Sequence, residues 1–305
     1  MNKQVSQTLK WKCVSPIMGV RYNRSLTDAI ANQPRLLPWS SFQNVVALFH
    51  WFKPADKKAK HHTLNTSSLR NFSQATVPLE YTGPDPTNPA AKVFRRFHAP
   101  LSVFLDYIEN PPQDVHIYLA QCSLNDLPRT MRKDLPIPKF LKAHARRPKD
   151  EGKPAAWDVY DSSLWIGLPP TCTPLHRDPN ANCFFQMAGT KTVRLLPPEK
   201  GLELFQRVKK RIGEGEGDLS GKIRGEEMMM GKEKEELERE VWDAAYDPES
   251  GGLEARLSRG EGLFIPEGWW HSVRGDGSTV TASVSSLSNM PSAMETLIGT
   301  DCANR

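Results

Sequence analysis

Short apolar runs bounded by glycine and proline dominate the second half of the chain. They combine β-branched, aromatic and leucine side chains, which is typical of short strands in a β-sandwich or β-barrel. Six such runs occupy residues 164–167, 183–187, 193–196, 255–257, 262–266 and 280–284. The pattern predicts a mainly β domain whose strands come from two separate blocks of sequence.

A highly charged segment separates the two blocks. Within it, residues 203–212 and 226–246 carry apolar side chains at helical spacing on an otherwise charged background. Charged helices of this kind usually form a solvated surface layer. We therefore predict a helical insertion outside the barrel, from about residue 199 to residue 258.

The first half of the chain mixes helical and strand patterns. Residues 97–109 have helical spacing and end before Pro111, and residues 115–121 favour a buried strand. We expect residues 31–150 to pack as N-terminal additions on a barrel formed by residues 151–287. An irregular tail is expected over residues 288–305.

Composition narrows the class of protein. The chain has 305 residues, 38% of them hydrophobic, and a net charge of +5. This length suffices for a substantial core, and the basic residues are scattered among acidic ones, so the charge pattern does not indicate a nucleic-acid-binding surface. The longest apolar run, 45–52, is too short to cross a membrane. The five cysteines contain no CxxC pair, which favours free thiols over a zinc site or a disulfide framework.

Residues 1–30 form a basic leader with no acidic residue before Asp28. The leader lacks the continuous apolar region of a secretory signal. Its composition fits either a mitochondrial transit peptide or an ordinary disordered N-terminus. We expect an intracellular protein, either mitochondrial or cytoplasmic and nuclear.

Candidate metal ligands occur in both β blocks. His176 and Asp178 stand two positions apart, and side chains at that spacing on an extended segment point to the same side. Downstream, His271 follows the run 262–266 and two tryptophans. Two imidazoles and one carboxylate form the facial triad of non-haem Fe(II) enzymes, which leaves coordination positions open for other ligands. The HxD motif alone is weak evidence, and the downstream histidine strengthens it.

Together these motifs resemble the Jumonji C and cupin-like Fe(II)- and 2-oxoglutarate-dependent oxygenases. The resemblance is closest to the branch containing the asparaginyl hydroxylase that inhibits hypoxia-inducible factor. It implies a double-stranded β-helix, also called a cupin or jelly-roll barrel, and it covers roughly residues 97–285. The segments that carry it are 165–178, Asn182, 184–186, 189–191, 196–198, 263–266 and 269–271.

The resemblance also implies roles for individual residues. It assigns His176, Asp178 and His271 as the ligands of Fe(II). It further implies a 2-oxoglutarate site, in which a lysine, a hydroxyl residue and a strand tyrosine meet the distal carboxylate and an asparagine lies near the metal. In this sequence the matching positions are Lys191, Thr173, Tyr118 and Asn182.

The sequence departs from the family after the last predicted strand. The family branch usually has asparagine and then aromatic residues there, whereas this chain continues with Ser285 and further small residues. Ser285 can still donate a hydrogen bond into the site. The missing aromatic residues place the closure behind the cosubstrate in question.

The resemblance implies hydroxylation of a protein or peptide side chain, with O2 as the oxidant. Demethylation of methyl-lysine, which begins with the same C–H hydroxylation, and hydroxylation of an RNA base are alternatives. A non-catalytic cupin that only binds a ligand or partner is the alternative from a different class. Neither a membrane nor a nucleic acid is indicated as a partner by the charge and hydropathy pattern.

Overall fold

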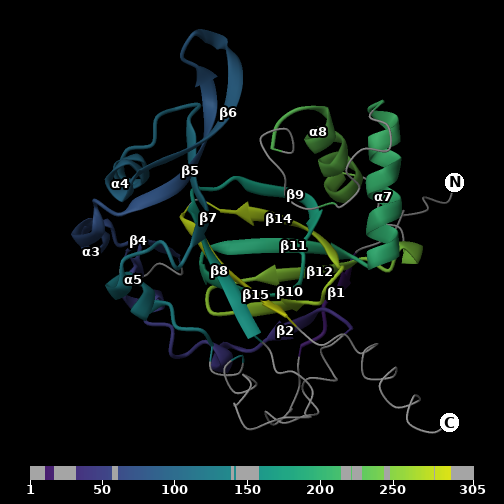
Figure 1. Ribbon diagram of the computed structural model, residues 1–305, viewed down its shortest axis with the longest axis horizontal. Coiled ribbons are helices and arrows are strands. Elements are labelled where there is room, and N and C mark those ends of the chain that lie inside the picture. Colours follow the sequence, from purple (N-terminus) through teal and green to yellow (C-terminus); the bar gives the residue numbers. More distant parts are fainter. Residues whose placement is uncertain are drawn as a thin grey trace, which may run out of the picture.

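Two β-sheets form the body of the molecule (Figure 1). The computed structural model describes residues 11–16, 32–56, 61–138, 141, 158–213, 221, 229–243, 248–277 and 279–289. In the order of its strands, the five-stranded sheet contains β1 (Lys12–Cys13), β12 (Leu253–Leu257), β11 (Thr190–Leu196), β14 (Trp270–Asp276) and β9 (Thr171–Arg177).

The larger sheet has eight strands. In order these are β2 (Arg35–Leu37), β13 (Gly262–Ile265), β10 (Ala181–Ala188), β15 (Thr281–Asn289), β8 (Asp158–Gly167), β7 (His116–Ser123), β5 (Thr76–Asp85) and β6 (Asn88–Pro100). A separate pair consists of β3 (Phe52–Pro54) and β4 (His62–Leu64). The predicted mainly β, cupin-like architecture is confirmed, and all six predicted apolar runs contribute to strands of the two sheets.

Consecutive strands from β8 to β15 alternate between the two sheets, except that β11 and β12 pair within one sheet. Because of this winding, many separate segments of sequence line the space between the two sheets. The central strand β10 is buried at all eight positions. Cys183, Phe185 and Met187 pack into the core under the N-terminal elements, whereas Asn182 and Phe184 face the interior between the sheets. Both faces of β10 are covered, which explains why apolar residues occupy both faces of the strand.

Elements from the first half of the chain extend the larger sheet. Strands β5, β6 and β7 add to its edge beside β8. Helices α2 (Ala47–His50), α3 (Thr66–Leu69), α4 (Leu101–Glu109) and α5 (Arg129–Asp134) accompany them, with single 3-10 turns at Trp39–Ser41 and Arg70–Phe72. The helix expected over 97–109 begins only at Leu101, because residues 97–100 still pair with β5. The eight-stranded sheet contains strands from both sides of residue 150. The division of the chain into two domains at that residue stays a prediction.

The predicted insertion is mostly helical. It contains α7 (Pro198–Arg211), α8 (Lys232–Glu238), a π-helical turn (Arg239–Asp243) and a 3-10 turn (Pro248–Ser250), on the side of the sheets opposite α3, α4 and α5 (Figure 1). A buried ion pair of 3.0 Å between Lys209 and Glu233 joins α7 to α8. The expected boundary at residue 258 is wrong, because β12 pairs with β11 inside the five-stranded sheet.

Both ends of the chain also differ from expectation. Strand β15 continues to Asn289, so the predicted tail does not begin at residue 288, and residues 290–305 lie outside the described part. Within the predicted leader, β1 pairs in parallel with β12, and Val14 is buried. The leader is therefore structured over residues 11–16, and residues 1–10 and 17–30 lie outside the described part.

Two further expectations concern the described residues alone. None of the helices there is long and apolar enough to cross a bilayer. The cysteines found there, namely Cys13, Cys122, Cys172 and Cys183, are free thiols.

Candidate metal centre

A bulge in β9 turns two functional side chains toward the interior. Residues of a regular strand alternate between its faces, so Thr173 and His176, three positions apart, would point to opposite sides. Thr173 pairs with Val273 and His176 pairs with His271, so two residues of β9 lie opposite the single residue Ser272 of β14. A β-bulge of this kind re-aims side chains and is common beside active sites. Thr173 and His176 both line the cavity as a result.

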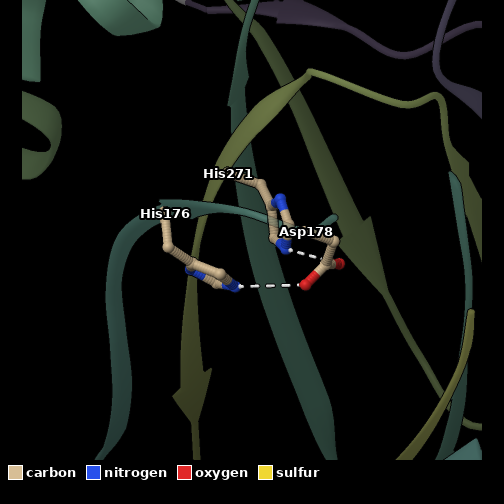
Figure 2. A group of neighbouring side chains, drawn as sticks. All are labelled: His176, Asp178 and His271. Atoms are coloured by element: carbon tan, nitrogen blue, oxygen red, sulfur yellow. Dashed lines mark ion pairs between the residues drawn. The ribbon is translucent and has the colours of Figure 1, made fainter. Parts of the chain in front are cut away.

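The three predicted metal ligands meet at the end of this strand pair. His176 and His271 are cross-strand partners, and Asp178 directly follows β9. The His176 Nε2 lies 4.0 Å from Asp178 Oδ1, and the His271 Nε2 lies 3.5 Å from Asp178 Oδ2. Figure 2 shows the three side chains converging on one point. One ligand atom from each residue lies within 4.8 Å of the others.

Backbone carbonyls orient both imidazoles. His176 Nδ1 lies 2.8 Å from the Pro174 carbonyl, and His271 Nδ1 lies 3.4 Å from the Trp269 carbonyl. An Nδ1–H donating to a carbonyl leaves Nε2 as the free acceptor that a metal requires. Burial, and then the charge of His271, lowers the pKa of His176 well below its ordinary value. The neutral ring that binds metals is therefore the favoured form of His176.

An asparagine holds the carboxylate in place. The Asn182 side-chain amide donates to Asp178 Oδ2 at 2.7 Å, and Asn182 comes from β10 in the opposite sheet. Within the described residues, the buried Asn182 Oδ1 has no hydrogen-bond partner. Two imidazoles and one carboxyl group, oriented by these outer partners, fit a divalent first-row metal with open positions and are consistent with Fe(II).

The ligands lie in a cavity of about 250 Å³ between the two sheets. At its buried end, Lys191 of β11 donates to the Ser283 hydroxyl at 2.8 Å and to the Tyr118 hydroxyl at 3.2 Å. The ammonium also lies 5.5 Å from the centroid of the Phe184 ring. Among the described residues, no carboxylate pairs with it.

Lys191 is 3% exposed, and burial lowers its pKa to about 7. A buried ammonium without a counter-ion is costly, and an anionic ligand would relieve that cost. The buried end of the cavity therefore suits a carboxylate.

All the residues predicted for the cosubstrate site line this cavity. Thr173, Tyr118, Asn182, Lys191 and Ser285 come from five different strands, β9, β7, β10, β11 and β15. The Tyr118 ring lies against Gly167 so closely that a Cβ on Gly167 would come within 2.2 Å of it. Gly167 is thus required for the position of Tyr118.

Sequence reasoning missed several residues of the cavity. Ser283 binds Lys191, and it stands two positions before Ser285, so strand alternation places both on the same face. Trp165 and Asp161 also line the cavity, and alternation along β8 could have identified them. Gln121 lines it as well, at a bulge of β7 with a φ of 50°, which no sequence pattern indicated.

Comparison with known proteins agrees with this geometry. The model of the cupin-like domain family matches residues 45–290, which is most of the chain. The chain belongs to the cupin-like domain family. The match extends well upstream of the residue 151 at which a barrel domain was expected to begin, in line with the continuous eight-stranded sheet.

Curated relatives of the chain are Jumonji C proteins. They include JmjC domain-containing protein D of Dictyostelium discoideum, 27% identical over 52% of this chain and 32% of that protein. Lysine-specific demethylase JMJ30 of Arabidopsis thaliana is 29% identical over 52% of this chain and 30% of that protein. The bifunctional arginine demethylase and lysyl-hydroxylase psr-1 of Caenorhabditis briggsae is 27% identical over 60% of this chain and 43% of that protein.

The matched region therefore spans only about a third of the length of the first two relatives. These matches support the cupin-like and Jumonji C relationship. The narrower resemblance to the asparaginyl hydroxylase branch stays a prediction.

Proposed function

We propose that the protein is an Fe(II)- and 2-oxoglutarate-dependent oxygenase that hydroxylates a protein side chain. The observation that carries this proposal is the convergence of His176, Asp178 and His271 in one cavity with the buried Lys191, which no described carboxylate pairs. A metal site alone has many uses. A facial triad beside a pocket for a carboxylate fits an enzyme that uses a 2-oxoacid as cosubstrate. Jumonji C relatives named as demethylases and hydroxylases support the same interpretation.

Each residue of the cavity has a defined task in this proposal. His176, Asp178 and His271 would hold Fe(II), which when bound couples the oxidation of 2-oxoglutarate to succinate and CO2 by O2 with hydroxylation of a substrate C–H bond. Lys191 binds the distal carboxylate of 2-oxoglutarate, because a charge-assisted hydrogen bond is stronger than a neutral one. Asn182 keeps the Asp178 carboxylate turned toward the histidines.

Hydroxyl groups complete the binding of the distal carboxylate. Tyr118 and Ser283 already hydrogen-bond Lys191. Thr173 faces the same cavity from β9, and Ser285 lines it one alternation beyond Ser283. With these groups preorganised around the ligand, little of the binding energy is lost in ordering them.

The exposed end of the cavity favours a cationic substrate side chain. Asp161 lines the cavity together with Ser123 and Gln121, and these three residues are half-buried or exposed, whereas Lys191 is buried. The only hydrogen bond of the Asp161 side chain to a described residue is a long one of 3.4 Å from Ser123, and no described cation pairs with it. A carboxylate that no described cation neutralises attracts a lysine or arginine side chain and disfavours an acidic one. The two relatives named for lysine and arginine chemistry agree with this preference.

Methyl-lysine demethylation is the second candidate, supported by the printed names of several relatives. It uses the same C–H oxidation and the same cationic substrate. RNA-base hydroxylation lacks comparable support, because the carboxylate of Asp161 in the cavity wall would repel phosphates.

Peptides with lysine, methyl-lysine, arginine or a neutral isostere at one position would test the proposal. After incubation with the Fe(II)-loaded protein, 2-oxoglutarate and O2, mass spectrometry distinguishes the gain of an oxygen atom from the loss of a methyl group. We expect oxygen gain on a cationic peptide, reduced several-fold by Asp161→Asn and abolished by Asp178→Ala. Modification of the neutral peptide alone, unaffected by Asp161→Asn, would contradict the assigned substrate class.

A further inference from the structure

The β9 bulge is tied to the outer face of the five-stranded sheet. Ser272 of β14 is the single residue opposite the bulge, and it lies between His271 and Val273, which face the cavity. Its side chain is buried and donates to the Thr173 carbonyl at 2.8 Å. The backbone segment that turns Thr173 and His176 inward is therefore fastened by a hydroxyl from the neighbouring strand.

That hydroxyl is in turn bonded by the helical insertion. The indole N–H of Trp242, in the π-helical turn Arg239–Asp243, donates to Ser272 Oγ at 2.9 Å. Trp242, Ser272 and Thr173 thus form one chain of hydrogen bonds from the insertion to the cavity wall. A π-helical turn widens a helix locally and is frequent at functional sites.

Two arginines fix the Trp242 ring. Arg194 of β11 lies 4.6 Å from the ring centroid, and its guanidinium also donates to the Val241 carbonyl at 2.7 Å. Glu254 of β12 holds the other side of the Arg194 guanidinium at 2.8 Å. Arg274 of β14 lies 4.5 Å from the same ring centroid. The position of the indole N–H is therefore determined by contacts with β11 and β14, and β12 supports it through the ion pair of Glu254 with Arg194.

We propose that Trp242 and Ser272 are positioning residues, through which the insertion holds the bulge and thereby the directions of Thr173 and His176. This inference rests on the proposed function for the identity of the two ligands affected, the metal and 2-oxoglutarate. Neither Trp242 nor Ser272 lines the cavity. Their effect on ligand binding is transmitted by the backbone of β9.

The alternative is that Trp242 only attaches the insertion to the sheet. A matched control separates the two cases. The double variant Lys209→Met with Glu233→Met removes the buried ion pair between α7 and α8 and keeps side-chain volume, while the Trp242–Ser272–Thr173 chain stays intact. A changed contact between α7 and α8 without a broken Trp242–Ser272–Thr173 chain is expected to leave ligand binding unchanged.

The test compares the parent with Trp242→Phe, Ser272→Ala, their double variant and the control. Trp242→Phe removes the N–H and keeps an aromatic ring between the arginines. Ser272→Ala removes a single hydroxyl, so it carries the test by itself if Trp242→Phe does not fold. The readouts are 2-oxoglutarate affinity of the Mn(II)-loaded protein by calorimetry, the visible spectrum of the Co(II)-loaded protein, and thermal unfolding.

We expect each single variant to bind 2-oxoglutarate about three- to tenfold more weakly, the range for losing one neutral hydrogen bond. The double variant should lose no more than either single variant, since both act on the same carbonyl. The Co(II) spectrum should change in all three, and the control should match the parent.

Parent-like 2-oxoglutarate affinity and Co(II) spectrum in Trp242→Phe would overturn the inference. An equal loss of affinity in the control would overturn it too, as would a loss in the double variant equal to the product of the two single losses. Failure of the parent itself to bind Co(II) would instead overturn the proposed function.

Discussion

At the scale of single residues, Lys191 indicates most specifically which charge the ligand carries. It is a fully enclosed ammonium whose described partners are two hydroxyls and two aromatic rings. A lysine kept only for packing would be better replaced by an apolar side chain, because an uncompensated buried charge destabilises the fold. Its presence beside the metal ligands therefore indicates that an anion completes the site.

Lys191→Met tests this directly. Methionine keeps much of the side-chain volume and removes the charge. We expect the affinity for 2-oxoglutarate to fall about tenfold or more, since a charge-assisted hydrogen bond contributes roughly 1.5–3 kcal/mol. Mn(II) binding, measured by calorimetry in the absence of 2-oxoglutarate, should be unchanged. Parent-like 2-oxoglutarate affinity in this variant would show that another group holds the distal carboxylate.

The same residue predicts a pH dependence of stability. Burial lowers the pKa of Lys191 to about 7 in the folded state, while the unfolded chain keeps an ordinary lysine value near 10.4. Between these values the unfolded state binds more protons, so the free energy of unfolding of the ligand-free protein rises with pH through this group.

Urea unfolding of the parent and Lys191→Met at pH 6.5 and 9 measures this contribution. The stability gained by the parent between the two values should exceed that of the variant. An identical pH dependence in both proteins would contradict the buried, uncompensated lysine.

At the scale of elements, the sequence indicated strands well and their irregularities poorly. Apolar runs and flanking glycines predicted β8, β10, β11, β12, β13 and β15, because local composition reports burial on a sheet. The β9 bulge was not predicted, since one extra residue leaves no pattern in hydrophobicity. Without it, Thr173 and His176 cannot share a face, and their joint assignment came from the family resemblance alone.

Contacts between strands far apart in the sequence could not be predicted either. The parallel pairing of β1 with β12 joins residues 12–13 of the predicted leader to a strand about 240 residues further along the chain. The contact of Ser283 with Lys191 joins two strands that are far apart in sequence. Neither has a local signal, although alternation from Ser285 would have placed Ser283 on the cavity face.

Gly167 offers a prediction about how one element positions another. It ends β8 beneath the Tyr118 ring, and an added Cβ would come within 2.2 Å of that ring. Gly167→Ala should displace Tyr118 from Lys191 and weaken 2-oxoglutarate binding several-fold, with metal binding unchanged. Gly213 has a φ of 78°, which disfavours alanine, but no heavy atom lies within 4 Å of an added Cβ there. Gly213→Ala is therefore the control for a destabilising glycine substitution outside the cavity. Calorimetry on Mn(II)-loaded protein checks both, and equal affinities in the two variants would refute the role of Gly167.

At the scale of the whole molecule, the two sheets contribute different residues to one cavity. The five-stranded sheet supplies His176, His271 and Lys191, and the eight-stranded sheet supplies Tyr118 and Asn182 from the opposite wall. A binding module needs no such convergence of metal ligands and a buried cation. The whole arrangement is accounted for if 2-oxoglutarate and a metal occupy the cavity together.

Succinate formation tests most directly the claim that the cavity holds a metal and 2-oxoglutarate and oxidises the latter. Purified protein is supplied with Fe(II), 2-oxoglutarate and O2, and succinate is quantified with and without cationic peptides, beside Asp178→Ala as the control. We predict succinate release that requires Fe(II) and O2, is absent in Asp178→Ala, and increases with a peptide substrate. A folded, iron-loaded parent that binds 2-oxoglutarate but releases no succinate above the Asp178→Ala level would contradict the oxygenase assignment and favour a non-catalytic cupin.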